Sequence, residues 1–346
     1  MSARWWDGFD YGALADLSKV YGSAAVAAHA TLNATAGRLG GAALVHDANA
    51  ANNALLNFPA AIFGSAAANS ANYVGFGSWI KIPSAPATNQ ALAICYNLAS
   101  VAQCQLFALT SGLLGHFNGS SVVETGLTNV CDNAWHWIEW RFKMATGNAT
   151  LVAYVDNVVQ WNQSAVGALG NGSWLQLLGM NGKANVWDDV LVYEDDGGAV
   201  PNIAQFPVGP QVCLTKRVTS DAAVSFATST GASHYTELDE VSCNTADYVR
   251  DFLSGAQDLF GLSALGYSPA SILGAGGKVI SSNPGVGNVS LRQCCKSGVT
   301  QANGATITVP LVTPLGKAEF FPTDPATGLA WGITGLDAAN FGFNIP

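Results

Sequence analysis

Short runs of alternating apolar and polar residues, separated by clusters of turn-forming residues, constrain the fold of this chain more than any other feature. The ranges 73–82 and 135–142 each alternate over the length of one strand, and 186–193 is a further strand-like run. The range 151–159 predicts a strand, an Asx-type turn at Asp156-Asn157 and a second strand. Successive side chains of a strand point to opposite faces, so this period of two predicts β-structure. Many short strands spaced about 8–12 residues apart are typical of a sandwich or jelly roll rather than a βαβ fold.

A stretch rich in structure-breaking residues, Asp-Asp-Gly-Gly-Ala-Val-Pro-Asn at 195–202, divides the chain. A chain of 346 residues is long enough for two domains, since domains commonly have ~100–200 residues. Nine of the ten Trp precede residue 190, which predicts an aromatic core for the first domain alone. We therefore expect a first domain at 1–205 and a smaller second domain at 206–346. In the second we expect strands at 211–216, 256–262, 277–282, 289–294, 305–312 and 317–321, and short helical turns at 245–253 and 336–340.

Charged residues are scarce, at 11% of the chain against the ~25% usual in soluble domains. The net charge is −9 and the longest basic run is Lys216-Arg217, so we expect no nucleic-acid partner. The apolar stretches are too short and interrupted to span a membrane, so we expect no membrane partner. Asp7, Asp10 and Asp16 interrupt the N-terminal region, which argues against a secretory signal peptide. A surface of Asn, Thr, Ser and Gly suits packing against other protein subunits.

The chain has seven Cys, an odd number, so at least one is either free or paired with another subunit. No C-x-x-C motif or zinc-finger spacing occurs, so we expect no structural zinc. Cys294 and Cys295 are adjacent in an expected strand and point to opposite faces, so we expect one of them to face outward. Their polar flanks, Arg292-Gln293 and Lys296-Ser297, indicate exposure, and Arg292 and Lys296 would favour the reactive thiolate. We predict that Cys294 or Cys295 forms an inter-subunit disulfide once the protein leaves the reducing cytoplasm. The alternative is a reduced pair, with one thiol buried and one idle.

Clustered acidic residues are the candidates for catalysis or metal binding. The β-glucanase pattern E-x-D-x-x-E is approached only at Glu237-Leu238-Asp239-Glu240-Val241-Ser242, where Ser242 replaces the last acid. We expect a solvated loop there and no catalytic residue. Asp188-Asp189 together with Asp156 could ligate calcium, which prefers oxygen ligands. The alternative is that Asp188 caps a turn while Asp189 points to solvent. We expect no cofactor and no bound metal.

Two tryptophans are candidates for binding sugar. Trp161 and Trp174 follow turn-prone stretches, and an indole ring presents an apolar face beside an N–H donor. Either could stack on a glycan at the loop rim of the first domain. The alternative is that both fill the core or an interface.

Motifs of the first domain resemble a known family. They are the segments Trp-Trp-Asp-Gly-Phe-Asp at 5–10, Gly-Arg-Leu-Gly-Gly-Ala-Ala-Leu at 37–44, Trp-His-Trp-Ile-Glu at 135–139, Tyr-Val-Asp at 154–156 and Trp-Asp-Asp-Val at 187–190. In their order they resemble the concanavalin A-like, laminin-G-type jelly rolls. The resemblance implies an all-β fold, with an N-terminal concanavalin-like jelly-roll sandwich followed by a second, smaller β-sandwich-like domain.

Motifs of the second domain are similar to a module common in structural proteins of tailed bacteriophages. They lie at 229–235, 239–240, 246–249, 258–260, 322–331, 336–337 and 341–343. In that group the module commonly follows a laminin-G-like domain, and the combined resemblance covers nearly the whole chain. It implies membership of the virion more strongly than a position within it.

The resemblance predicts a non-enzymatic structural component of a tailed-phage virion, made in the host cytoplasm. We expect an exterior accessory, namely a collar or neck fibre, a tail fibre component or a capsid decoration, that acts by protein–protein docking and display. Its partners would be other virion proteins and further copies of itself, as a homo-oligomer and by analogy a trimer, with surface glycans as a candidate ligand. The alternative is a secreted carbohydrate-binding protein or glycoside hydrolase on the same concanavalin-like fold.

Overall fold

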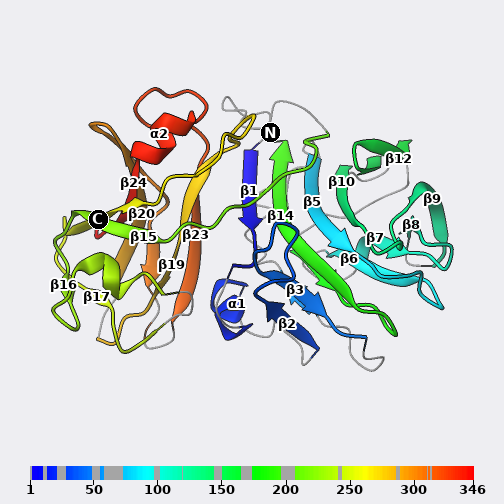
Figure 1. Ribbon diagram of the computed structural model, residues 1–346, viewed down its shortest axis with the longest axis horizontal. Coiled ribbons are helices and arrows are strands. Elements are labelled where there is room, and N and C mark those ends of the chain that lie inside the picture. Colours follow the sequence, from blue (N-terminus) through cyan, green and yellow to red (C-terminus); the bar gives the residue numbers. More distant parts are fainter. Residues whose placement is uncertain are drawn as a thin grey trace. The chain divides into compact units, whose positions relative to one another are not determined.

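A computed structural model describes residues 2–10, 14–21, 29–48, 55–57, 73–96, 102–118, 120–143, 150–164, 174–195, 207–240, 244–285, 289–309, 311 and 314–346. The chain divides into two compact units, Met1–Leu214 and Thr215–Pro346. The boundary falls later than the expected residue 205, because the segment 207–213 is hydrogen-bonded to the first unit. Nearly all described elements are strands, which confirms the all-β fold class (Figure 1). No helix in these ranges is long and apolar enough to cross a membrane.

The first unit is a sandwich of two sheets. Its elements are β1 (Ser2–Asp7), α1 (Leu14–Tyr21), β2 (Ala30–Asn33), β3 (Ala43–His46), β4 (Leu55–Asn57), β5 (Tyr73–Lys81), β6 (Gln90–Tyr96), β7 (Ala102–Ala108), β8 (Leu113–Phe117), β9 (Val122–Asn129), β10 (Trp135–Lys143), β11 (Thr150–Val155), β12 (Val158–Ser164), β13 (Trp174–Leu178) and β14 (Asn185–Asp195). Among described residues one sheet has the order β12-β11-β10-β5-β14-β3-β2, with β1 paired to β14, and the other β4-β13-β6-β7-β8-β9.

Alternation along β10 builds the core of the first unit, as the sequence predicts. Ile138, Trp140 and Phe142 share one face of β10 and are fully buried. Trp140 is paired in register with Phe76 of β5 and meets Phe142 edge-to-face at a centroid distance of 5.1 Å. The turn after β11 is also as expected, because Asp156 and Asn157 both have positive φ, at 50° and 68°. Two such residues form the tight turn that joins antiparallel strands without splaying them.

The second unit contains a larger sheet and two short ones. Its elements are β15 (Val218–Ala223), β16 (Ala227–Thr228), the 3-10 helix η2 (His234–Glu237), β17 (Val249–Arg250), β18 (Gln257–Leu262), β19 (Ala275–Ser281), β20 (Val289–Ser297), β21 (Thr300–Asn303), β22 (Ile307–Val309), β23 (Leu315–Phe321), α2 (Ile333–Ala338) and β24 (Asn340–Asn344). In the described part of the chain the larger sheet has the order β15-β18-β24-β20-β21, with β22 paired to β20, and β16-β17 and β19-β23 form separate pairs.

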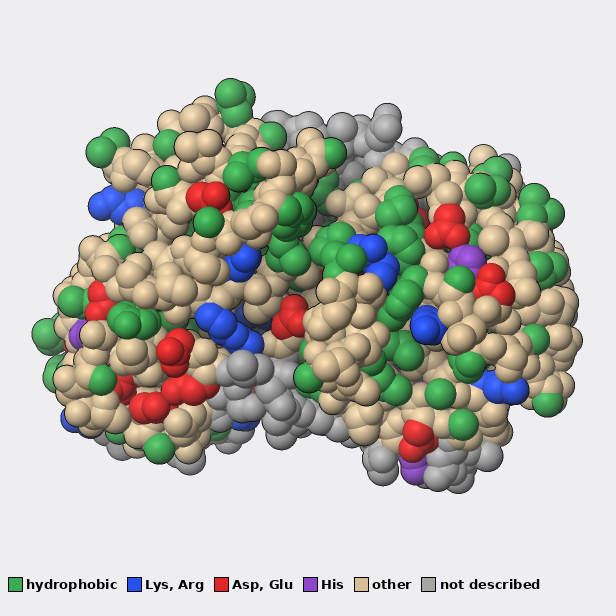
Figure 2. Space-filling model, viewed as in Figure 1, with side chains coloured by type: hydrophobic (Ala, Val, Ile, Leu, Met, Phe, Trp, Pro, Cys, Tyr) green, Lys and Arg blue, Asp and Glu red, His purple; other side chains and the backbone are tan. Residues whose placement is uncertain are grey.

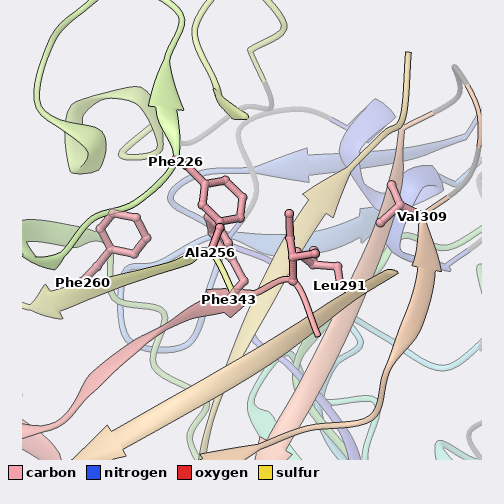
Figure 3. Close-up of a cluster of buried hydrophobic side chains, with 7 residues drawn as sticks. Phe226, Ala256, Phe260, Leu291, Val309 and Phe343 are labelled. Atoms are coloured by element: carbon pink, nitrogen blue, oxygen red, sulfur yellow. The ribbon is translucent and has the colours of Figure 1, made fainter. Parts of the chain in front are cut away.

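A cluster of aromatic and aliphatic side chains packs the second unit on one face of the larger sheet. Phe343 of β24 lies 5.2 Å from Phe226 and 5.9 Å from Phe260, measured between ring centroids. Figure 3 shows these rings together with Leu291 of β20 and Val309 of β22. Because these residues all project from one face, the alternate residues of β18, β24 and β20 project from the other.

Two local predictions in the second unit are wrong. The range 211–216 forms no strand, because its backbone groups bond to side chains of the first unit instead of a neighbouring strand. The range 245–253 forms no helical turn but contains β17, and the short helix lies earlier, at η2. The helix expected at 336–340 overlaps α2, and strands overlap the remaining expected ranges.

Candidate functional site

Glu139, in the middle of β10, is a fully buried carboxylate that accepts four hydrogen bonds. Its Oε1 accepts from the Tyr193 hydroxyl at 2.9 Å and the Val208 amide at 2.6 Å. Its Oε2 accepts from the Gly209 amide at 3.0 Å and the Trp137 indole at 3.3 Å. Burial and the neighbouring carboxylate raise the pKa of Tyr193 well above its ordinary value, so the phenol stays a donor. The carboxylate therefore anchors the segment that leads out of the first unit.

Sequence reasoning missed this anchor, although β5 carries a signal for it. Gly75 and Gly77 flank Phe76, and a Cβ at either glycine would overlap the ring of Tyr193 or Trp137. A glycine inside a strand often marks a close approach of this kind. The Gly-Phe-Gly sequence thus indicates that large rings lie over β5, but not which carboxylate they surround.

Asp188 and Asp189 form a second buried acidic centre at a register irregularity in β14. Asp188 Oδ2 accepts from the Arg38 amide at 2.8 Å, and Asp189 Oδ1 accepts from the Cys213 amide at 2.8 Å. The Arg38 guanidinium lies 3.9 Å from Asp189 Oδ2 and 4.2 Å from the centroid of Trp79. Burial raises the pKa of Asp188 to about 6 and, with the charge of Asp188, that of Asp189 to about 7. The expectation that Asp189 points to solvent is wrong, because the irregular backbone turns it toward Cys213.

The residues weighed as calcium ligands do not come together. Asp156 belongs to a separate network, where it accepts from the Trp137 amide at 2.8 Å and contacts His136 Nδ1 at 2.7 Å. Asp132 contacts the other nitrogen of the same ring at 3.1 Å, and the bond to Asp156 raises the pKa of His136. In the described residues no group of three His, Cys, Asp or Glu side chains could hold a metal ion.

Glu237, the nearest approach to a glycosidase acid, is an anchor within the second unit. It is 1% exposed, so the expectation of a solvated loop is wrong at this residue. Its carboxylate accepts from the amide and hydroxyl of both Ser229 and Thr230, and from the Tyr248 amide at 3.0 Å. Burial would raise the pKa of Glu237, but these bonds outweigh it and lower the pKa to about 2. An acid with that pKa is ionised at neutral pH and cannot act as a proton donor.

The cysteines predicted to join subunits lie inside the second unit. Cys294 and Cys295 are 1% and 0% exposed, so the expectation that one of them faces outward is wrong. Cys295 packs in a cluster with Trp331 and Phe341, and the Gln257 amide group covers Cys294 at 3.4 Å. Burial raises the pKa of both thiols, that of Cys295 to about 12. At Cys294 burial outweighs the Gln257 hydrogen bond and the charge of Arg292, which both lower the pKa. The inter-subunit disulfide stays a prediction. It requires that the side chains that bury Cys294 and Cys295 on β20 move away.

Another cysteine pair, unforeseen from the sequence, occurs in the first unit. Cys95 of β6 and Cys104 of β7 are register partners, and both are buried free thiols. Burial and the neighbouring Cys95 raise the pKa of Cys104, so the thiol form is favoured. Only the strand register reveals that these two residues face each other.

The two predicted sugar-stacking residues have different outcomes. Trp161 of β12 is only 5% exposed, so its ring offers no open face for stacking and the alternative of a core residue fits. Trp174 begins β13, and its side chain lies outside the described residues.

An exposed apolar edge remains where the two sheets of the first unit approach each other, at β9 and β12. The Gln160 side chain of β12 joins the two strands. Its Oε1 accepts from the Leu127 and Thr128 amides at 2.7 and 2.9 Å, and its Nε2 donates to the Val158 carbonyl at 2.8 Å.

Large apolar side chains on these two strands face solvent. Leu127 is 75% exposed, and Val123, Val158 and Val159 are each more than two-fifths exposed. We call these four residues the β9–β12 edge. Each strand ends its sheet among the described residues, and Glu124 is the only charged residue on either strand. This surface, rather than any of the saturated carboxylates, is the candidate functional site of the first unit.

The fold and the site together define a two-unit β-sandwich protein with an exposed apolar edge in its first unit. No protein-family model matches the chain, and no curated protein matches it. Among solved structures, a sialidase is 12% identical over 57% of this chain and 19% of its own, with a TM-score of 0.40. The alginate lyase Aly36B is 7% identical over 55% of this chain and 95% of its own, with a TM-score of 0.39. A heptameric SAP-like pentraxin from Limulus polyphemus is 12% identical over 35% of this chain and 63% of its own, with a TM-score of 0.28.

These matches concern the fold alone. This chain spans 19% of the first sialidase and 26% of a Trypanosoma rangeli sialidase. The expectation of a non-enzymatic chain is corrected, because the solved structures that the chain matches include proteins named as sialidases and alginate lyases.

Proposed function

We propose that this chain is a structural component of a tailed-phage particle and that it acts by docking against other protein subunits, including further copies of itself. The observation that carries the docking function is the β9–β12 edge, with its four exposed apolar side chains. The order of family-like motifs along nearly the whole chain supports the placement in a virion. An exterior accessory, such as a collar or neck fibre, a tail fibre component or a capsid decoration, is the position that we propose.

The chemistry of the edge favours a second copy of this chain as the partner. Strands at a sheet edge pair readily with other strands, and soluble proteins usually protect them with charged residues, above all Lys. β9 and β12 carry no Lys or Arg, and Glu124 is their only acid. The face in view in Figure 2 likewise shows few charged side chains among apolar and uncharged ones. An apolar, almost uncharged edge meets little electrostatic repulsion from an identical edge. By analogy with phage appendages we propose a trimer.

Mass spectrometry of purified particles tests the virion placement, and absence of the chain from every particle fraction would overturn it. Light scattering after size exclusion tests the docking. We expect the wild-type chain to self-associate and Leu127→Glu to dissociate it, because the substitution places a charge at the most exposed residue of the β9–β12 edge. Leu39→Glu is the matched control, because Leu39 is 66% exposed in the same unit but lies outside the edge. A wild-type chain that stays monomeric at high concentration would overturn self-docking, and equal dissociation by both variants would show that the edge is not the interface.

A further inference from the structure

The second unit has an open hollow of ≈ 280 Å³ that the docking function does not use. Four of its lining side chains are amides, Gln257, Gln301, Asn303 and Asn344, and a fifth is Arg292. The lining contains no acidic side chain. Such a surface is built to donate and accept hydrogen bonds rather than to bury an apolar ligand.

Strand register places these side chains on one face of the larger sheet. Asn344 of β24 is paired with Gln257 of β18 on one side and with Arg292 of β20 on the other. Asn303 of β21 is the partner of Cys294, which follows Arg292 by two residues on β20. Directly paired residues, and residues two apart on one strand, share a face. Four neighbouring strands thus contribute to a single polar surface, opposite the hydrophobic cluster of Figure 3.

Hydrogen bonds among these side chains hold them in place. Gln257 Nε2 donates to Gln301 Oε1 at 2.9 Å, and Gln301 Nε2 donates to Asn303 Oδ1 at 3.0 Å. Asn344 Nδ2 donates to the same Asn303 oxygen at 2.9 Å, and Arg292 Nε donates to Asn344 Oδ1 at 3.2 Å. This chain of bonds fixes the amide orientations before any ligand arrives. A preorganised polar surface loses little side-chain entropy on binding.

Arg292 supplies the positive charge of the hollow. Its Nε is used by Asn344, and within the described residues its terminal nitrogens have no carboxylate partner. A guanidinium presents its N–H groups as a planar fork that matches a carboxylate, often with two parallel bonds. The side-chain amides around it can pair with hydroxyl groups, because each carries both a donor and an acceptor. The combination fits a ligand that bears a carboxylate and several hydroxyls.

An exposed aromatic residue lies in the chain just before the hollow. Phe252 is 80% exposed, and the loop continues into Ser254 and Gly255, which line the hollow. Asp251 holds the loop, since its Oδ1 accepts from the amides of Phe252 and Leu253 at 2.6 and 2.9 Å. An exposed aromatic ring two residues before Ser254, which lines the hollow, offers a surface for the apolar face of a sugar ring.

We propose that this hollow binds a carboxylated sugar, with the carboxylate on Arg292, hydroxyls on the surrounding amides and the ring against Phe252. The site differs from the stacking site expected from the sequence, which lies in the first unit. It is independent of the β9–β12 edge.

Titration calorimetry of the full chain with oligogalacturonate and with neutral galacto-oligosaccharide tests the proposal. We expect binding of the acidic oligomer only, weakened by salt. Arg292→Gln should lose about tenfold or more in affinity, since a hydrogen bond to a charged group contributes about 1.5–3 kcal/mol and 1.4 kcal/mol is tenfold. Arg250→Gln is the matched control, because Arg250 is an exposed arginine of the same unit outside the hollow. Phe252→Ala should weaken binding severalfold.

Three outcomes would overturn the proposal. They are no binding of the acidic oligomer by the wild-type chain, equal binding of the neutral oligomer, and an equal loss in Arg292→Gln and Arg250→Gln. A peptide carboxylate that binds as tightly as the acidic sugar would also overturn it, since the amides would then contribute nothing. Arg292→Lys separates folding from recognition, because it keeps the positive charge but removes the planar fork of N–H groups. An intermediate affinity with an unchanged circular dichroism spectrum supports the proposal. Wild-type affinity would contradict the role of the fork in binding the carboxylate.

Discussion

Two polar side chains on sheet faces, Glu139 in the first unit and Arg292 in the second, differ in whether another segment of the chain covers them. On β10 of the first unit, Glu139 lies beneath the segment 207–209, whose amides use its oxygens. On β20 of the second unit, Arg292 lies in a hollow open to solvent. Both residues occupy ordinary alternate positions of a central strand. The difference teaches that a polar residue on a sheet face becomes an anchor or a binding group according to whether another segment of the chain covers it.

Removing the buried carboxylate of Glu139 should lower the free energy of unfolding more than any of the other substitutions. Glu139→Ala leaves four donors, including the Tyr193 hydroxyl and the Trp137 indole, without their acceptor in a buried site. We expect the free energy of unfolding to fall by about 3–4 kcal/mol. Urea unfolding followed by Trp fluorescence measures it in the first unit, which contains nine of the ten Trp. Glu124→Ala is the control, with a change within about 0.5 kcal/mol, and a similarly small change for Glu139→Ala would refute the anchor.

The buried pair Asp188 and Asp189 should make the first unit less stable as pH rises. The pKa of Asp189 is raised from 3.8 to about 7 in the folded state. Between these values the folded state binds more protons than the unfolded state, so stability falls from about pH 4 to about pH 7. Asp189→Asn keeps an acceptor for the Cys213 amide and removes the charge. We expect it to raise the free energy of unfolding by about 2 kcal/mol at pH 8 and to have little effect at pH 4. An effect of equal size at both pH values would contradict the assignment.

The half-buried network of His136 and Asp156 should also make the first unit less stable as pH rises, but by a smaller amount. The pKa of His136 is raised above 6.5, chiefly by its hydrogen bond to Asp156. The stability that this pairing contributes is fully present below pH 6.5 and is lost as pH rises through the folded pKa. Because both carboxylates are about two-fifths exposed, we expect only about 0.5–1 kcal/mol. An NMR titration of the His136 ring in wild type and Asp156→Asn measures the pKa, and the same value in both would exclude Asp156 as the cause.

The open face should tolerate substitution with the least effect on stability. Arg292→Gln removes a charge that solvent reaches. The Asn344 oxygen loses its Nε donor, but it lines the open hollow, where water can replace that donor. We expect the free energy of unfolding to change by no more than about 0.5 kcal/mol, although sugar affinity falls. Urea unfolding followed by far-ultraviolet circular dichroism measures it. A loss as large as that of Glu139→Ala would show that Arg292 is a structural anchor and would remove the contrast between the two faces.

Local patterns predicted most of the strands but not the sites. The alternation at 135–142 predicted β10, and Asp156-Asn157 predicted the turn after β11, because both depend on neighbours in the chain. The burial of Glu139 depends on amides about 70 residues away, at Val208 and Gly209. The polar flanks of Cys294 suggested an exposed thiol, but Gln257, distant in the sequence, covers it.

The sequence by itself determined an all-β chain of two parts, because strand period, turn chemistry and scarce charge are local properties or sums over residues. Tertiary structure alone decided which polar residues serve the fold and which remain open. Strands β18, β20, β21 and β24 bring together residues from Gln257 to Asn344, and only their register places the Arg292 guanidinium among four amides. The physical reason is that covering a sheet face requires contacts between segments far apart in the chain, and neither the alternation of a strand nor its turns specifies them.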